Sequence, residues 1–174
     1  MAVRTLAHAA FFSNNVERMI DFYCNILGFE RAFTMSMESP YQWALADANN
    51  ANLPEETRAA RAAYAKAMEP QRDSMWLTYL RVSDNQFIEL FREISPLEVG
   101  NITPGSTARQ GYNHMAIVVD DLQSEVQKIQ ARGGHFRTSI SLGPDYTYQC
   151  WIDDPDGNMI EYMEYTDRSL QLVR

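Results

Sequence analysis

This sequence has little cysteine, no long apolar run and no excess of basic charge. Only Cys24 and Cys150 are present, which favours reduced thiols in a cytosolic protein over a disulfide-stabilised secreted domain, although a single disulfide is compatible with the sequence. No apolar stretch approaches the roughly 18 residues that span a bilayer. The opening MAVRTLAHAAFF lacks the cleavage region of a signal peptide. We therefore predict a cytoplasmic protein with no membrane partner.

The charge balance excludes a second group of partners. Aspartate and glutamate number 23 against 15 lysines and arginines, for a formal net charge of −8. Nucleic acid is therefore not an expected partner. The chain also lacks a glycine-rich phosphate loop, a paired-cysteine motif and a nucleophile elbow. A hydrophobic fraction of 45% is nevertheless sufficient for a folded core.

The most informative feature present is an internal repeat. The segment LAHAAFFSNNVERMIDFYCNILG around His8 corresponds without a gap to YNHMAIVVDDLQSEVQKIQARGG around His114, at an offset of 106. A second block, RVSDNQFIELF, corresponds to DDPDGNMIEYM at an offset of 72, so that Glu89 matches Glu161. Each copy therefore carries one histidine near its start and one glutamate near its end, at matching positions.

Each copy predicts the same order of elements, a strand, a helix and three more strands. The helices have apolar residues at spacings of three and four and end at glycine, Gly28 in the first copy and Gly133-Gly134 in the second. The fold class is therefore α+β, with two tandem βαβββ modules. The expected strands are Leu6–Phe12, Arg31–Met37, Met75–Val82 and Phe87–Ile94 in the first copy, and His114–Val119, Phe136–Leu142, Thr147–Ile152 and Met159–Tyr165 in the second.

The repeat also predicts the domain boundaries. The first module is expected at residues 1–94 and the second at 112–166, with a tail at 167–174. Residues 95–111, rich in Pro, Gly, Ser and Thr, are expected to link the modules.

One segment of the first copy has no counterpart in the second. Because the offset falls from 106 to 72, the first copy holds 34 extra residues, which we place at about 44–73. Pro54, the acidic pair Glu55-Glu56 and the alanines of LPEETRAARAAYAKAM predict a helix there. A helical flap over a site, a dimer contact and a surface decoration are all open roles for it.

Strand alternation gives the neighbours of the four repeated side chains. His8 and His114 each share a strand face with a small alanine, which leaves space in front of the imidazole. Glu89 and Glu161 lie between apolar residues, where a carboxylate is costly to bury unless a cation meets it. Two histidines and two glutamates are a suitable ligand set for one divalent metal ion. The alternative is a duplication that preserved these residues for packing alone.

Two further polar residues have simpler interpretations. His135, the third histidine, follows a helix end and is expected at the surface. Arg109 precedes the second module and could meet an anionic substrate, but a solvated linker residue is the simpler reading.

These repeated residues resemble the vicinal oxygen chelate superfamily, which includes glyoxalase I, methylmalonyl-CoA epimerase, extradiol dioxygenases and bleomycin-binding proteins. The resemblance covers nearly the whole chain apart from the insert and the tail. It implies a cupped mixed sheet around one divalent ion (Ni, Zn, Co, Mn or Fe), a small-molecule substrate that chelates through two neighbouring oxygens, and a homodimer. Carried over by position, the implied metal ligands are His8, Glu89, His114 and Glu161.

The His, Glu, His, Glu set is most similar to bacterial glyoxalase I, which implies a metal-dependent lyase or isomerase. In that chemistry the metal stabilises an enediolate, and Glu161 or Glu89 moves the proton between carbons. Glu161 is favoured because its module lacks the insert. Phe12 stands where glutathione-dependent relatives place arginine, which argues against glutathione. The alternatives are an epimerase or an iron-dependent dioxygenase of the same superfamily, and a protein that sequesters a small aromatic compound.

Overall fold

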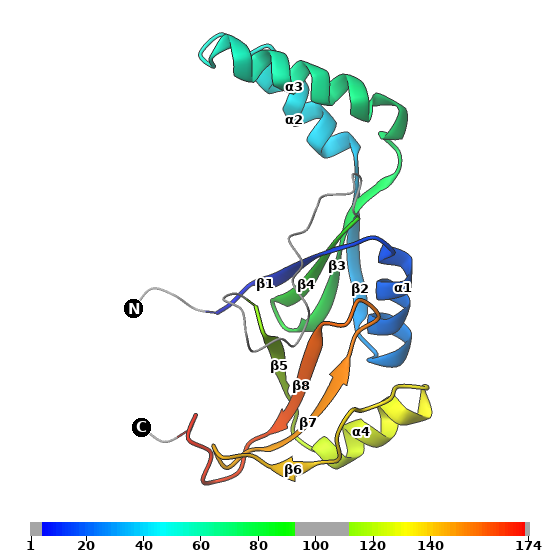
Figure 1. The fold of residues 1–174 in the computed structure, drawn as a ribbon, viewed down its shortest axis with the longest axis vertical. Helices are drawn as coiled ribbons and strands as arrows, with labels where there is room; N and C mark the ends of the chain where they lie inside the picture. The colour runs from blue at the N-terminus through cyan, green and yellow to red at the C-terminus, as the bar shows by residue number, and fades with distance from the viewer. Residues whose placement is uncertain (1–4, 93–111, 173–174) are drawn as a thin grey trace. The chain divides into compact units, whose positions relative to one another are not determined.

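The computed structural model describes residues 5–92 and 112–172, which form two four-stranded sheets of mixed strand direction (Figure 1). Corresponding strands occupy the same place in each sheet, and this confirms the predicted α+β class with two tandem modules. The first sheet has the order β1 (His8–Ser13), β4 (Gln86–Arg92), β3 (Met75–Ser83) and β2 (Glu30–Ser36), and the second has the order β5 (His114–Val118), β8 (Met159–Glu164), β7 (Tyr148–Asp153) and β6 (Ser141–Leu142).

The contacts divide the chain into two compact units that do not follow the sequence boundaries of the repeat. The first unit comprises Met1–Phe12 and Glu30–Arg92, and the second comprises Ser13–Phe29 and Glu93–Arg174. The helix between β1 and β2 therefore belongs to the second unit, although both of its flanking strands belong to the first. The module boundaries at 1–94 and 112–166 stay a prediction, and the expected linker at 95–111 lies outside the described residues.

The helices of the second unit begin and end as the repeat predicts. The side chain of Asn15 accepts the backbone N–H of the third helical residue of α1 (Val16–Asp21), and that of Asp121 does the same for α4 (Leu122–Ala131). From Phe22 to Ile26 the first helix continues as a π-helix, which periodicity alone did not indicate.

Gly28, after the helix that follows β1, allows this part of the chain to approach Arg132 at the end of α4. It ends the π-helical turn with φ of +87°, and a Cβ there would lie 2.7 Å from an Nη atom of Arg132. The same guanidinium donates to the carbonyl of Leu27 at 3.1 Å. A side chain at position 28 would displace this contact, so glycine is required both for the backbone conformation and for the space.

A buried carboxylate joins the first helix to the β7–β8 turn. Asp154 is 4% exposed and accepts bonds from the Tyr23 hydroxyl at 2.9 Å and the Asn158 amide at 2.8 Å, besides the backbone N–H groups of Asp156 and Asn158. In the DPDGN sequence of this turn, Gly157 adopts a positive φ of 85°, which suits glycine in a hairpin. Burial raises the pKa of Asp154, and the hydrogen bonds from Asn158 and Tyr23 partly oppose that rise.

The first unit carries the insert as a helical hairpin. It consists of α2 (Glu38–Ala48), α3 (Glu55–Met68) and the short 3-10 helix η2 (Glu69–Gln71), which returns the chain to β3 (Figure 1). The predicted helix is α3, whereas α2 was not predicted. The core of the hairpin consists of Tyr41, Ala44 and Ala65, with Leu45 and Met68 packed against them.

An ion pair closes the base of this hairpin. The guanidinium of Arg72 donates to both carboxylate oxygens of Glu38, at 2.5 and 2.8 Å, and lies 4.5 Å above the ring of Tyr41. This bidentate contact lowers the pKa of Glu38. Glu38 is the first residue of α2, and Arg72 directly follows η2. The ion pair therefore holds the two ends of the helical hairpin together.

One expected strand is shorter in the structure. The pattern predicted Phe136–Leu142, but β6 contains only Ser141 and Leu142, and Phe136 forms an isolated bridge with Ile152. The physical reason is the side chain of Thr138, whose hydroxyl accepts the backbone N–H of Trp151 at 3.2 Å. A side-chain acceptor thus replaces a backbone carbonyl and interrupts the ladder.

Two expectations from composition can be compared with the structure. Within 5–92 and 112–172, no helix is long and apolar enough to cross a membrane. Cys24 and Cys150, both described, do not form a disulfide.

We predict that Tyr23→Phe destabilises the protein by roughly 1.5–3 kcal/mol at neutral pH, because it removes a donor from a buried charged carboxylate. Stability contributed by the neutral carboxyl of Asp154 is present below the ordinary aspartate pKa and is lost as pH rises through the raised folded-state value. The loss in the variant should therefore shrink near pH 3. Urea unfolding of the wild type and the variant from neutral pH down to pH 3 measures this loss of stability. A loss of equal size at every pH would contradict the interpretation.

Candidate metal-binding site

In the first unit, the predicted ligands His8 and Glu89 come together on neighbouring strands. The Nε2 atom of His8 on β1 lies 3.4 Å from Oε2 of Glu89 on β4. The carboxylate side chain is only 10% exposed, whereas the imidazole is 42% exposed. The pair therefore has a buried acid and an imidazole that remains accessible from solvent.

The second unit repeats this arrangement. The Nε2 atom of His114 on β5 lies 3.3 Å from Oε2 of Glu161 on β8. The two strands are parallel, and Glu161 pairs in register with Ala116, the small residue that shares a strand face with His114. The space predicted in front of the imidazole is thus filled by the carboxylate.

The second imidazole also has an orienting partner that the sequence did not reveal. Nδ1 of His114 lies 2.7 Å from the side-chain oxygen of Asn113. Because an amide oxygen only accepts, Nδ1 is the donor in this contact, and the contact fixes the orientation of the ring. Nε2 faces the carboxylate of Glu161, so each ring nitrogen of His114 lies against an oxygen atom. The position of Asn113 in the repeat is taken by Ala7, so this orienting contact is present in one copy only.

An aromatic ring accompanies each pair, and the repeat contains the signal for it. At the offset of 72, Tyr79 corresponds to Trp151. Tyr79 is in register with Glu89 and stands edge-on to His8, with ring centroids 5.7 Å apart.

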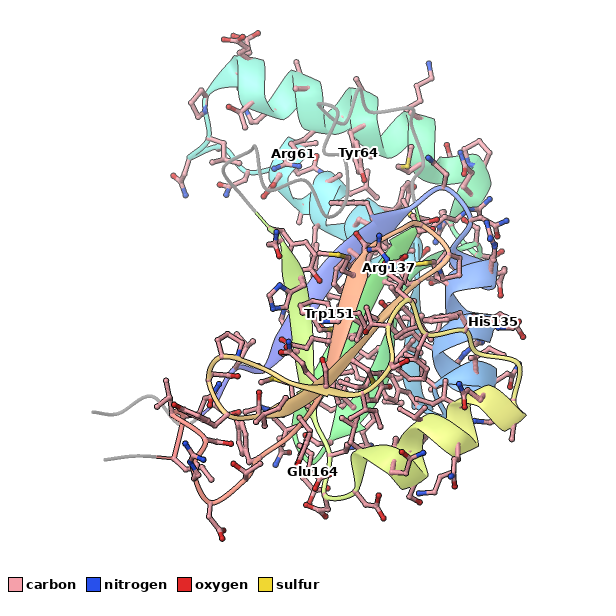
Figure 2. The ribbon with its side chains drawn as sticks, turned by 60° about the horizontal axis from the view of Figure 1, so that its bottom comes forward. Arg61, Tyr64, His135, Arg137, Trp151 and Glu164 are labelled. Atoms are coloured by element: carbon pink, nitrogen blue, oxygen red, sulfur yellow. The ribbon has the colours of Figure 1, made fainter. Side chains whose placement is uncertain are left out.

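In the second unit, Trp151 on β7 (labelled in Figure 2) is in register with Glu161 and stands edge-on to His114 at 4.9 Å. These rings limit the access of water to the two carboxylates. Burial, followed by a hydrogen bond with Glu89 and the charge of that residue, raises the pKa of Tyr79 to about 12, so its hydroxyl remains protonated near neutral pH.

The carboxylates of Glu89 and Glu161 are both buried, and burial changes the pKa of Glu161. Burial raises its pKa, the nearby imidazole of His114 lowers it, and the charge of Asp145 raises it again, with a net rise. A carboxyl group with a raised pKa is a better proton acceptor once it is ionised.

The donor separations can be compared with those around a metal ion. Two donors bonded to one ion at about 2.1 Å stand about 3.0 Å apart in octahedral geometry and about 3.4 Å apart in tetrahedral geometry. The His–Glu separations of 3.4 and 3.3 Å agree with this range. In the described parts of the chain, no group of three or more His, Cys, Asp and Glu side chains is arranged to hold an ion, so each unit offers two ligands. Binding of one ion by all four stays a prediction.

The sequence named two other candidates, His135 and Arg109. His135 is exposed, as predicted, and lies beside the glycines that follow α4 (Figure 2). Arg109 lies outside the described residues.

Comparison with known proteins decides the family. The sequence profile of the Glyoxalase/Bleomycin resistance protein/Dioxygenase superfamily matches residues 5–162. The chain belongs to this superfamily. The match spans both His–Glu pairs and confirms the resemblance that the repeat indicated.

Solved structures of the superfamily share the fold at low identity. Lactoylglutathione lyase from Agrobacterium tumefaciens is 18% identical, with 94% of this chain and 96% of that chain covered and a TM-score of 0.54. A glyoxalase family protein from Enterococcus faecalis is 16% identical, with coverage of 94% and 100% and a TM-score of 0.59. A superfamily member from Sphaerobacter thermophilus DSM 20745 is 18% identical, with coverage of 95% and 100% and a TM-score of 0.55. No curated protein matches the chain.

We predict that Glu161→Gln stabilises the metal-free protein above neutral pH. Since burial raises the folded-state pKa of Glu161, wild-type stability is fully present below the ordinary glutamate pKa and is lost as pH rises through the raised value. The glutamine variant does not titrate, so its advantage should grow with pH and vanish near pH 3. Thermal unfolding in EDTA measures this, with Glu17→Gln, an exposed position, as the control. An advantage independent of pH would contradict the prediction.

Proposed function

We propose that this protein is a metal-dependent lyase or isomerase of the glyoxalase I type. The observation that carries the proposal is the orientation of His114, whose Nδ1 faces an amide oxygen while Nε2 faces the buried carboxylate of Glu161. Metal-bound histidines commonly hold their second ring nitrogen in this way. The proposed ligands of one divalent ion (Ni, Zn, Co, Mn or Fe) are His8, Glu89, His114 and Glu161.

The chemistry follows from the residues of each pair. When bound, a divalent ion would stabilise negative charge that develops on a substrate oxygen. The carboxylate of Glu161 takes the proton from the carbon beside that oxygen, as the C–H bond breaks, and returns it to the neighbouring carbon. Burial favours this role, because it strengthens the carboxylate as a base. Glu89 is the alternative base.

The aromatic surroundings favour a second candidate, a protein that sequesters a small aromatic compound. Tyr79 stacks on Phe33 with centroids 4.5 Å apart and also contacts Phe87 at 5.8 Å. These rings lie around the first His–Glu pair and would suit an apolar ligand. Such a binder needs no metal, so metal content separates the two candidates.

We also propose that the protein is a cytoplasmic homodimer. The two cysteines outside any disulfide support a reducing compartment. The homodimer rests on the resemblance to the superfamily, and the molar mass in solution, from light scattering, tests it.

We predict that His114→Ala lowers divalent-metal affinity at least about 100-fold, because it removes one of four ligands and leaves Glu161 without its neighbour. His135→Ala is the matched control, since this exposed histidine belongs to neither pair. Elemental analysis after purification without added metal, followed by calorimetric titration, measures both. Full metal occupancy in His114→Ala would refute the ligand assignment, and no metal in the wild type would favour the aromatic-binding candidate.

We predict that Glu161→Gln abolishes proton exchange at the reacting carbon while it retains part of the metal. Hemithioacetals and α-hydroxyketones, which chelate through two neighbouring oxygens, serve as the substrate panel, and deuterium incorporation from solvent is followed by NMR. If Glu89→Gln loses exchange and Glu161→Gln does not, the roles are reversed. Turnover that consumes oxygen and is insensitive to both changes would establish the dioxygenase alternative instead.

A further inference from the structure

The helical insert forms a pocket of its own. Its volume is about 500 Å³, which is within the usual range for small-molecule sites. The pocket lies wholly within the first unit, between the two helices of the insert and the start of β3. Figure 2 shows Arg61 and Tyr64 on the helix α3 that forms one wall. The lining residues are Pro40, Trp43, Ala46, Asp47, Arg61, Tyr64 and Trp76.

Two tryptophans make a right-angled corner in this pocket. Trp43 and Trp76 meet edge to face, with centroids 5.6 Å apart and an interplanar angle of 86°. Trp76 also contacts Phe91, with ring centroids 5.6 Å apart. Trp43, in contrast, is 60% exposed. A flat ring that stacks on Trp43 would therefore lie nearly perpendicular to the ring of Trp76, and perpendicular rings are one of the arrangements that aromatic pairs prefer.

A cationic group stands at the edge of the same corner. The Nε atom of Arg61 lies 3.3 Å from the carboxylate of Asp47, which fixes the plane of the guanidinium, and the arginine side chain is 52% exposed. Arginine carries its remaining donors on the two Nη atoms. They can donate to an acceptor oxygen on the rim of a ligand that stacks on Trp43.

We propose that this pocket binds a flat aromatic compound that carries an acceptor oxygen at its edge. The pocket is preformed, since the Arg72–Glu38 ion pair and the core around Tyr41 hold the hairpin closed without a ligand. The second copy of the repeat contains no such insert, so the site is particular to the first unit and independent of the proposed metal chemistry.

Two fluorescent probes test the proposal on the full chain. 8-Anilinonaphthalene-1-sulfonate carries acceptor oxygens, and N-phenyl-1-naphthylamine has the same ring system without them. Trp43→Ala should weaken both roughly threefold to tenfold, and Trp43→Phe should restore much of the loss. Arg61→Gln should weaken only the sulfonate. Leu142→Ala, which truncates a side chain of similar exposure in the other unit, is the control and should change neither.

The three tryptophans of the chain provide a direct localisation. With ¹⁵N-labelled indoles, the probe should shift the signals of Trp43 and Trp76 and leave that of Trp151 unchanged, and circular dichroism should show that Trp43→Ala retains its helices. Shifts at Trp151 alone, or unchanged affinity in a folded Trp43→Ala, would overturn the proposal. A change of molar mass in Trp43→Ala would also overturn it, because the indole would then serve a contact between copies of the chain. None of these outcomes depends on metal, so they leave the proposed function untouched.

Discussion

A buried carboxylate facing an imidazole is the constraint on which both units depend. Glu89 and Glu161 are 7% and 6% exposed, on central strands whose other face is apolar. A carboxylate in such surroundings loses its hydration and must be compensated by a proton or a cation. The imidazole on the neighbouring strand provides only part of that compensation, and in the second unit it is shared between Asn113 at Nδ1 and Glu161 at Nε2. The arrangement is therefore better suited to holding a cation than to stabilising the fold.

The strand order explains why one histidine and one glutamate meet in each unit. In both sheets the first strand of the module lies beside its last strand, so residues far apart in sequence become neighbours. The third strand then adds an aromatic ring on the far side of the glutamate, Tyr79 in one unit and Trp151 in the other. The result is a carboxylate with an imidazole on one side and a ring on the other, which limits the water around it without closing the side that faces the histidine.

The repeat is not two independent halves. The helix that follows β1 belongs to the second unit, where Tyr23 donates to Asp154 and Gly28 allows Arg132 to reach the chain. The insert modifies the first unit alone. Its ends are joined by Glu38 and Arg72, and two tryptophans with an arginine line the pocket that it forms. With the insertion closed in this way, β2 and β3 still pair antiparallel up to Ser36 and Met75, with a register shift between Met35 and Ser36 beside the insert.

The sequence by itself determined the repeat, the order of elements, the α+β class and the identity of the His–Glu pairs, because periodicity and matched spacing are local properties of the chain. It did not predict α2, because the helix ESPYQWALADA depends on packing of Tyr41 and Ala44 against α3, which the sequence alone does not show. Nor could it show the shortened β6, which depends on one hydroxyl of Thr138. Only the tertiary structure decided three further features. These are the partner of Asn113, the unit to which the first helix belongs, and the tryptophan corner of the insert. The unit of the first helix and the tryptophan corner depend on contacts between residues distant in sequence, and the Asn113 contact depends on the side-chain conformations of two adjacent residues. Neither propensity nor spacing encodes such contacts.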